Sequence, residues 1–486
     1  MIDALIQQFE SPLCGFSTGA ALDVVHPAGV VRDELMQPHV YSKSEHATPV
    51  QSVPPLRIGV VFSGGPAPGG HDVLCGILNH LRPEDALIGF CNGPGGLLRS
   101  EHKVLTPDDI QLIEGVGGFD FLGTDRTKLS TTDQFNVVSD VIESMNISVL
   151  IVVGGDDSNT NALFLSDALF GRCHVIGVPK TIDGDLGYPP YLPVTFGFHT
   201  ATQHYSRLVQ QLAIDAVATK KYWHVVKLMG RSASHVALEV AHQVCPNACV
   251  LAEEIMVSGW HFLDVINYFS SVIHDRFLQK KPYGVIVFPE GMVGVIPEFQ
   301  SFLSGDIGPL NECLLSIGAS PLSMASVILD AHGNPNLSML QSEKIIQDAI
   351  AAYLAHHYSD VSNVQLMAHF FGYTGRSEDP TAFDSAYALL LGKTAYELAL
   401  SGVSSVIVGC DFSNQGVQPV GLPLIAMLHF DDARSMHVIQ KQLVSTSDPD
   451  YQAYVQQKSD WVTLDVRVPR SAWFEYPYRF RFGDEW

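Results

Sequence analysis

Apolar and β-branched residues in this chain are gathered into short runs, and each run ends at a loop rich in glycine, proline or acidic residues. The first run, 56–62, leads into a glycine-rich loop at 63–70 and then into 71–81, where apolar residues recur at helical spacing. Short apolar runs of this kind are typical of strands that are buried on both faces of a parallel sheet. The pattern therefore predicts a strand, a loop and a helix in that order.

The same order recurs further along the chain. Additional strands are predicted at 149–153, 174–178, 283–288 and 404–409. The first two lead into polar loops at 154–158 and 179–185, and a helix is predicted at 159–169. The stretch 305–362 lacks strand signal and is predicted to be mostly helical. Strands that alternate with helices indicate an α/β protein with mostly parallel sheets.

The predicted elements form two Rossmann-like α/β halves. The expected division is an N-terminal extension at 1–55, α/β domains at 56–220 and 221–410, a helical insertion in the second domain at about 305–362, and a C-terminal extension at 411–486 that packs on either domain. In sheets of this class, ligands bind beyond the carboxyl ends of the strands. The unusual loops all follow predicted strands, so we expect the chemistry of the protein at those ends.

Composition narrows the possible functions. The 486 residues include 51 Asp and Glu against 28 Lys and Arg, which gives a net charge of −23, and 46% of the residues are hydrophobic. A chain this acidic is not expected to bind nucleic acid or an anionic membrane, and its apolar content is too high for a disordered protein. Any phosphate-bearing ligand must therefore be held by a few local cations.

The location of the protein is also predicted from composition. The eight cysteines are sparse and lack the spacing of zinc ligands, as expected for reduced thiols in the cytosol. The first ten residues include Asp3 and Glu10 and no apolar core of a signal peptide. No window reaches the roughly 18 consecutive apolar residues that a membrane-spanning helix needs. We expect a cytoplasmic protein.

The loop 63–70, with the sequence SGGPAPGG, is the first candidate site. Glycines allow a ligand to approach the backbone, and the N-terminus of the following helix offers unpaired N–H groups to a phosphate. The loop matches neither the dinucleotide fingerprint GxGxxG nor the Walker motif, which argues against a nicotinamide oxidoreductase and a P-loop enzyme. A tight turn without a ligand is the alternative interpretation.

Two acidic loops follow the next strands. Asp156 and Asp157 come directly after an apolar run, where carboxylates are costly unless they bind a cation or accept hydrogen bonds, and Mg²⁺ is the economical explanation. The alternative is a helix N-cap. In the loop 179–185, Asp183 can accept a proton from an alcohol while Lys180 neutralises a transferring phosphoryl group. A surface turn with a salt pair is the alternative there.

Three further motifs supply arginine and glutamate to the predicted site. They are MGR at 229–231, PEG at 289–291 and GYTGR at 372–376. Arginine suits the fork of a sugar phosphate, and glutamate suits sugar hydroxyls. Each motif is weak alone, and the ordered set is specific.

That ordered set, GGxxPG, GGDDS, PKTIDGD, MGR, PEG and GYxGR, resembles the phosphofructokinases, and most closely their long pyrophosphate-dependent form. The resemblance spans roughly residues 56–410, and the segments KLMGRSASHVALE and FPEG resemble the family most specifically. It implies the phosphofructokinase fold, with the active site in the cleft between the two α/β halves. The first half would then bind the phosphoryl donor and the second half fructose 6-phosphate.

The resemblance implies specific roles around the donor. Gly64, Gly65 and Arg126 match residues near the donor phosphates, and Asp156 matches the Mg²⁺-binding aspartate. Asp157 and Lys180 stand where ATP-using relatives have glycine. A carboxylate at 157 would repel the α-phosphate of ATP, and the ammonium of Lys180 would bind pyrophosphate and stabilise the transfer.

The resemblance also implies the sugar site. Asp183 matches the general base that deprotonates the 1-hydroxyl, and Asp185 is a supporting carboxylate. The implied sugar-binding residues are Thr181, Ile182, Asp183, Lys221, Tyr222, Met229, Gly230, Arg231, Glu290, Tyr373, Thr374, Gly375 and Arg376. In the family a basic group enters this site from a neighbouring subunit. Lys221 and Tyr222 match that position in the long form, which implies a homodimer with a shared site.

The implied activity is the reversible, Mg²⁺-dependent transfer of a phosphoryl group from pyrophosphate to the 1-hydroxyl of fructose 6-phosphate, in glycolysis and gluconeogenesis. The presence of Asp157 and Lys180 argues against the alternative, an ATP-dependent phosphofructokinase. A non-catalytic regulatory subunit is disfavoured because the expected base, Asp183, and metal ligand, Asp156, are both present. One departure is Asp72, where many long-form members have Asn; His71 and Asp72 are expected to cap their helix.

Overall fold

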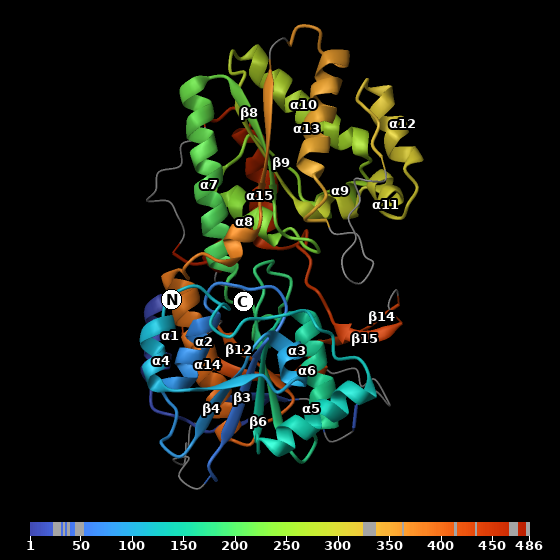
Figure 1. The fold of residues 1–486 in the computed structure, drawn as a ribbon. Helices are drawn as coiled ribbons and strands as arrows, with labels where there is room; N and C mark the ends of the chain where they lie inside the picture. The colour runs from blue at the N-terminus through green and yellow to red at the C-terminus, as the bar shows by residue number, and fades with distance from the viewer. Residues whose placement is uncertain are drawn as a thin grey trace. The chain divides into compact units, whose positions relative to one another are not determined.

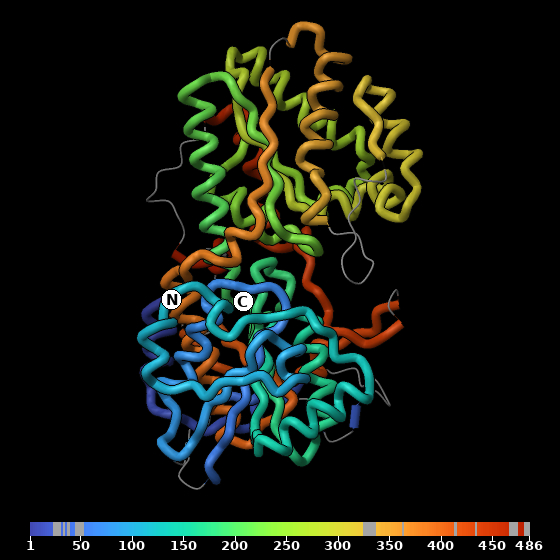
Figure 2. The backbone as a smooth tube through the Cα atoms, in the orientation of Figure 1, coloured from blue at the N-terminus to red at the C-terminus, as the bar shows by residue number. Residues whose placement is uncertain are grey.

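The computed structural model describes residues 1–486 except 23–30, 33–34, 36–38, 44–52, 324–336, 362–363, 413–415, 433–434, 466–474 and 483–486. Within the described residues the chain forms two compact units. Unit 1 comprises 1–200 and 376–442, and unit 2 comprises 201–375 and 443–482. The colours of Figure 2 follow the chain through both units, since orange and red segments return to each of them. The passage from unit 1 to unit 2 lies in helix α7 (Phe198–Thr219).

Unit 1 is built on one large mixed sheet (Figure 1). In spatial order its strands are β1 (Phe16–Ala21), β2 (His39–Lys43), β13 (Gln418–Pro423), β12 (Val406–Asp411), β7 (His174–Pro179), β6 (Val149–Gly154), β3 (Arg57–Phe62), β4 (Ala86–Phe90) and β5 (His102–Leu105). From β12 to β4 the strands are parallel, and antiparallel strands extend the sheet at both edges. Every residue of β6 is buried, as expected for a strand that helices cover on both faces.

Two groups of helices cover this sheet (Figure 1). One group contains α1 (Ile2–Glu10), α2 (Gly70–Leu78), α4 (Pro107–Ile113) and α14 (Ala382–Leu400). The other contains α3 (Gly93–Leu98), α5 (Thr132–Ser144) and α6 (Asp156–Ala168). After β13, a 3-10 turn (Leu424–Met427) leads into a hairpin of β14 (Leu428–Asp431) and β15 (Met436–Ile439).

Helices α2 and α14 approach each other closely because each has a glycine at the contact. A Cβ on Gly76 would lie 2.1 Å from the carbonyl oxygen of Leu389, and one on Gly392 would lie 2.1 Å from that of Val73. Real Cβ atoms do not come this near, so any side chain at either position would push the helices apart. This contact fixes the helix that follows the glycine-rich loop.

Unit 2 contains a smaller, fully parallel sheet (Figure 1). Its order is β11 (Gln365–Phe371), β8 (Tyr222–Leu228), β10 (Gly284–Pro289) and β9 (Ala248–Cys249). Most of α7 belongs to this unit. Its other helices are α8 (His235–Val244), α9 (Ala252–Ser258), α10 (Phe262–Leu278), α11 (Pro297–Leu303), α12 (Gly308–Ser316), α13 (Ser342–His357) and α15 (Pro449–Trp461), with short 3-10 turns at Glu290–Gly294 and Tyr478–Phe482. A separate apolar core, rich in phenylalanine and isoleucine, lies between them.

The strands predicted from apolar runs are confirmed as β3, β6, β7, β10 and β12. Helix α6 begins at Asp156, three positions before the predicted start, because carboxylates in a first turn are favoured by the positive end of the helix dipole. The predicted helical stretch is confirmed in α12 and α13, and part of it lies outside the described residues. No helix in the described part of the chain is long and apolar enough to cross a membrane. The eight cysteines are free thiols.

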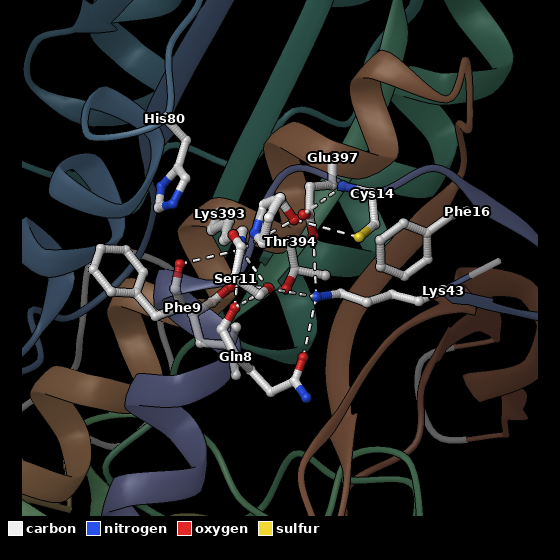
Figure 3. Close-up of polar contacts among 12 residues, drawn as sticks. Gln8, Phe9, Ser11, Cys14, Phe16, Lys43, His80, Lys393, Thr394 and Glu397 are labelled. Carbon is white, nitrogen blue, oxygen red and sulfur yellow. Dashed lines mark hydrogen bonds and ion pairs between the residues drawn. The ribbon is translucent and has the colours of Figure 1, made fainter. Parts of the chain in front are cut away.

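The N-terminal extension is tied to α14 by a buried ammonium group (Figure 3). Lys393 Nζ donates to the carbonyl oxygens of Gln8 at 2.9 Å and Phe9 at 3.1 Å, and also to the carbonyl of Ser11. These carbonyls belong to the end of α1, where the last C=O groups lack partners within the helix. The cation also meets the negative end of the α1 dipole. Lys393 is thus the C-terminal cap of a helix that is distant in sequence.

Glu397 balances this charge one turn further along α14 (Figure 3). Its carboxylate lies 3.7 Å from Lys393 Nζ and 3.9 Å from Lys43 Nζ, and it accepts a hydrogen bond from the backbone N–H of Cys14 at 3.0 Å. The side chains of Lys393 and Glu397 are fully buried. Burial lowers the pKa of Lys393 and raises the pKa of Glu397. Breaking one side of such a pair leaves a buried charge without compensation.

We therefore expect Lys393→Met to lower the free energy of unfolding by about 3–5 kcal/mol, because Glu397 and the α1 carbonyls would lose their cation. Chemical denaturation of the variant and the wild type measures the difference. The matched control is Lys344→Met, which removes an exposed ion pair with Asp348 and should change stability by no more than about 0.5 kcal/mol. Equal midpoints for Lys393→Met and the control would refute the anchoring role.

Candidate active site

The polar loops of unit 1 come together because three parallel strands end side by side. In the register of the sheet, Phe62 at the end of β3 pairs with Val153, and Gly154 at the end of β6 pairs with Pro179 at the end of β7. The residues that follow are the glycine-rich loop, the acidic start of α6 and the loop 180–185. The backbone N–H of Lys180 donates to Gly154 O at 2.9 Å and continues this alignment past the strands. The expected strand-edge site is therefore formed in unit 1.

Three cations lie against the backbone of the glycine-rich loop. A Cβ placed on Gly64 would lie 3.4 Å from Lys180 Nζ. A Cβ placed on Gly65 would lie 3.4 Å from Arg376 Cζ and 3.6 Å from Arg126 Nη2. Gly64 has a φ of +89°, a conformation that side chains disfavour. The two glycines thus leave open backbone beside two guanidinium groups and an ammonium group, which is the chemistry of an anion site.

Lys180 is the most enclosed of these cations, with 7% of its surface exposed. Burial, and to a lesser extent the nearby Arg376, lower its pKa to about 8, although the carboxylates of Asp183 and Asp156 oppose the change. The neighbouring acids therefore offset only part of the cost of burying this ammonium. An anionic ligand beside Lys180 would favour the charged form in the same way.

The loop after β7 is held by its own hydroxyl groups. Thr181 Oγ1 donates to Asp185 Oδ1 at 3.0 Å and accepts from the backbone N–H of Asp183 at 3.0 Å. Thr195 Oγ1 donates to the carbonyl of Thr181 at 2.7 Å. Ile182 is buried, whereas Asp183 is only partly buried. The turn therefore holds the backbone of Asp183 while its carboxylate stays partly accessible to solvent.

Two buried carboxylates face a lysine that the sequence motifs do not include. Lys441 Nζ lies 3.5 Å from Asp156 Oδ2 and 3.9 Å from Asp185 Oδ2. Burial raises the pKa of both Asp156 and Asp185, and Lys441 counteracts the rise. Asp157, next in the first turn of α6, is exposed. Lys441 lies beyond the recognisable motifs, and no sequence signal identifies it.

The carboxylates at this edge of the sheet suit a magnesium ion that is held partly by phosphate oxygens. No group of three or more His, Cys, Asp or Glu suited to a metal occurs in the described ranges. Mg²⁺ in phosphoryl-transfer sites is commonly held by one or two carboxylates together with phosphate oxygens and water. Asp156 and Asp185, which both contact Lys441, provide two hard oxygen ligands close together. The donor set therefore suits Mg²⁺ that arrives with a phosphate ligand.

The remaining predicted residues gather at one edge of the sheet in unit 2. Leu228 at the end of β8 pairs with Pro289 of β10 and with Phe371 of β11, so the motifs that follow start side by side. These motifs contain Met229, Gly230, Arg231, Glu290, Tyr373, Thr374 and Gly375. Gly291 N donates to Gly230 O at 3.0 Å and links two of the motifs. These motifs therefore begin at the same edge of the sheet in unit 2.

The side chains of this second set differ in exposure. Met229 and Glu290 are buried, and Arg231 and Tyr373 are exposed. Glu290 Oε2 accepts a hydrogen bond from Ser338 Oγ at 2.8 Å. Thr374 Oγ1 and Gly375 are held by the neighbouring helix α7, through a 3.0 Å hydrogen bond to His204 Nε2 and a close approach of Tyr205. Arg376 is the exception in its motif, because it belongs to unit 1 and lies beside Gly65.

Lys221 and Tyr222 occupy the start of β8, at the opposite end of the strand from Met229. Lys221 is exposed and Tyr222 is half-buried. Their position separates them along the strand from the other predicted sugar-binding residues of unit 2. A role for them in the sugar site therefore depends on contribution from another subunit, as the sequence resemblance implies.

The prediction that His71 and Asp72 cap their helix is wrong. Helix α2 has Gly69 as its N-cap and no capping side chain. His71 instead contacts Val116 O through Nδ1 at 2.7 Å and accepts from Phe121 N at 3.2 Å, and Asp72 accepts from Gly115 N at 2.8 Å. Both side chains are buried and bond the backbone of the neighbouring loop 115–121 instead of the end of their own helix.

Comparison with known proteins identifies relatives along most of the chain. The model of the phosphofructokinase family matches residues 57–399. The chain is 33% identical over 451 residues to the pyrophosphate–fructose 6-phosphate 1-phosphotransferase of Porphyromonas gingivalis, which covers 84% of this chain and 82% of that one. It is 34% identical over 443 residues to the beta subunit of the enzyme of that name in Solanum tuberosum, covering 84% and 77%.

The fold is also found among solved structures. A pyrophosphate-dependent phosphofructokinase from Nitrosospira multiformis aligns with a TM-score of 0.60 and 15% identity, over 87% of this chain and 96% of that chain. Mostly parallel sheets with cations and carboxylates at their carboxyl ends define an α/β protein with strand-edge polar sites. The chain belongs to the phosphofructokinase family.

Beneath the glycine-rich loop, Asp72 on α2 and Asp384 on α14 form a second acidic pair. Both are fully buried, and Asp72 Oδ2 and Asp384 Oδ1 have no hydrogen-bond partner in the described part of the chain. Asp384 Oδ2 accepts from Thr200 N at 2.7 Å and from Thr200 Oγ1 at 2.6 Å. Burial raises the pKa of Asp72 to about 6 and that of Asp384 to about 7, and the charge of Asp72 adds to the rise at Asp384. The folded protein therefore keeps protons here that the unfolded chain loses near pH 4.

Because the folded state binds more protons between about pH 4 and pH 7, this pair makes stability fall as the pH rises through that window. We expect Asp72→Asn to remove the part of that loss that Asp72 causes, since an amide oxygen can still accept from Gly115 N. The stability of the variant relative to wild type should rise by about 2–3 kcal/mol between pH 4 and pH 7.5. Denaturant titrations across this pH range measure the difference, and a difference that stays constant with pH would contradict the assignment.

Proposed function

We propose that this chain transfers a phosphoryl group reversibly from pyrophosphate to the 1-hydroxyl of fructose 6-phosphate, with Mg²⁺, and releases fructose 1,6-bisphosphate and phosphate. The observation that carries the proposal is the cluster of Lys180, Arg126 and Arg376 over the open backbone of Gly64 and Gly65. Such a cluster suits a small polyanion. The names of the relatives from Porphyromonas gingivalis and Solanum tuberosum supply the identities of donor and acceptor.

Donor choice would follow from two positions in unit 1. Asp157 is exposed in the first turn of α6, where its charge would repel the additional phosphate of a nucleotide. Lys180 lies at the glycine loop, where its ammonium would bind a pyrophosphate oxygen. A carboxylate and an ammonium at these positions favour pyrophosphate over ATP.

The chemical step would use Asp183 as a general base. The sugar 1-oxygen attacks one phosphorus of pyrophosphate, its bond to phosphorus forms as the bond to the leaving phosphate breaks, and the hydroxyl proton passes to Asp183. Lys180 and Arg376 would stabilise negative charge on the transferring group. Asp156, supported by Asp185, would hold Mg²⁺, which would supply positive charge to neutralise the donor.

The sugar would be recognised by the strand-edge motifs of unit 2 together with the loop 181–183. Arg231 is exposed and presents a guanidinium suited to the 6-phosphate, and Glu290 presents a carboxylate suited to sugar hydroxyls. Met229, Gly230 and the segment 373–375 would shape the site around them. We also propose a homodimer, in which the exposed Lys221 and adjacent Tyr222 reach the sugar site of a second subunit.

The direct test is a purified-enzyme assay with fructose 6-phosphate and Mg²⁺ that compares pyrophosphate with ATP. We expect turnover with pyrophosphate, and Asp183→Asn should lower kcat by about 10²–10⁴-fold because the proton acceptor is lost. Calorimetry should show fructose 6-phosphate binding within a few-fold of wild type in that variant. Asp348→Asn, which changes an exposed carboxylate on α13, is the matched control and should behave as wild type. Turnover with ATP alone, or wild-type kcat for Asp183→Asn, would refute the proposal.

A second prediction concerns the donor. The double variant Asp157→Gly with Lys180→Gly should lose at least about tenfold in kcat/KM for pyrophosphate, because a charge-assisted contact disappears. Its ratio of kcat/KM for ATP to that for pyrophosphate should rise, since the repelling carboxylate is gone. Steady-state kinetics with each donor at saturating fructose 6-phosphate measure both quantities. Unchanged pyrophosphate kinetics would show that these positions do not select the donor.

A further inference from the structure

Beyond the family motifs, the structure points to one more residue of the donor site. We propose that Lys441, from the segment after β15, binds pyrophosphate as a fourth cation of this site. The inference rests on the function proposed above and adds to it a residue beyond 57–399, the range that the family model matches.

The first support is the position of the ammonium group. Lys441 Nζ lies 3.5 Å from Asp156 Oδ2 and 3.9 Å from Asp185 Oδ2, the two carboxylates suited to Mg²⁺. The lysine side chain is 30% exposed, whereas the side chains of Asp156 and Asp185 are 18% and 8% exposed. The lysine is therefore the more solvent-accessible member of this cluster, and a solvated anion can reach it.

The second support is the way the backbone around Lys441 is fixed on both sides. Ile439 N donates to Thr160 Oγ1 at 3.0 Å, and Thr160 lies one helical turn after Asp156 on α6. Gln442 N donates to Asp185 O at 2.9 Å, and Gln440 N donates to Met427 O at 3.0 Å. The segment is thus bonded to both elements that carry the carboxylates. These hydrogen bonds hold the backbone of Lys441 at the edge of the sheet where the donor would bind. The local sequence carries no motif that would predict this position.

The third support is energetic. A partly exposed ion pair contributes only about 0–1 kcal/mol to stability, so contacts with Asp156 and Asp185 give Lys441 little value as a stabilising residue. A hydrogen bond to a charged ligand is worth more. Mg²⁺ and Lys441 would compete for the same two carboxylates. When the metal binds, the flexible side chain of Lys441 would allow its ammonium to turn to a phosphate oxygen. Lys441 would therefore weaken the binding of the metal by itself and strengthen the binding of the metal together with pyrophosphate.

Lys441→Met tests this inference in the full-length enzyme. We expect KM for pyrophosphate, and its dissociation constant by calorimetry with Mg²⁺ present, to rise about tenfold or more, while KM for fructose 6-phosphate stays within about twofold. Lys441→Arg should recover most of the pyrophosphate affinity, and Lys344→Met on α13 should match wild type. Binding of Mn²⁺ alone, followed by electron paramagnetic resonance as a probe of the metal site, should become tighter in Lys441→Met because a competing cation is gone.

The outcomes separate the inference from the proposed function. Wild-type pyrophosphate binding in Lys441→Met would overturn the inference. Weaker binding of both pyrophosphate and Mn²⁺ would also overturn it, since that pattern means that Lys441 only supports the shape of the acidic pair. A wild-type enzyme that fails to use pyrophosphate would instead refute the proposed function.

Discussion

The structure of unit 1 depends on the balance of charge at the carboxyl ends of the strands of its sheet. Parallel strands that end together bring their polar loops together, and here the acids of those loops meet Lys180 and cations from other segments of the chain. In the described residues the acids are Asp156, Asp157, Asp183 and Asp185, and the cations are Lys180, Arg126, Arg376 and Lys441. Buried carboxylates alone would take up protons, and buried cations alone would lose them. Each set counteracts part of the effect of burial on the pKa of the other, and the glycine backbone leaves room beside them for a ligand.

The N-terminal extension contributes to this arrangement although it carries no motif. The N-terminal extension supplies β1 and β2 to the sheet of unit 1, and Lys393 fixes α1 on α14. Helix α14 in turn packs closely on α2, the helix that follows the glycine-rich loop, through Gly76 and Gly392. A chain of contacts thus connects the first residues of the protein to the loop that would bind the donor. Segments outside the family match are therefore part of the structure that holds the site.

Sequence reasoning predicted the parts of the fold that depend on local pattern. Apolar runs identified β3, β6, β7, β10 and β12, and the rule that sites follow strand ends located the loops that contain Gly64, Asp156 and Lys180. Strand β11 escaped prediction because it lies at the edge of its sheet and none of its residues is buried. Lys441 and the pairing of Asp72 with Asp384 could not be predicted, since both depend on segments that meet only after folding.

The geometry of this site shows how a chain with a net charge of −23 can still accommodate an anion. Exposed carboxylates more than about 10 Å from a ligand are largely screened at ordinary salt. Charges within hydrogen-bond range of a partly buried site are not screened in this way, so a ligand there responds mainly to its immediate neighbours. The acidic surface can therefore coexist with a site for a polyanion, provided that the site carries its own cations. Because Asp156 and Asp185 are the carboxylates proposed to hold Mg²⁺, the proposal requires that the cation beside them can leave, and a lysine on a flexible stem meets that requirement.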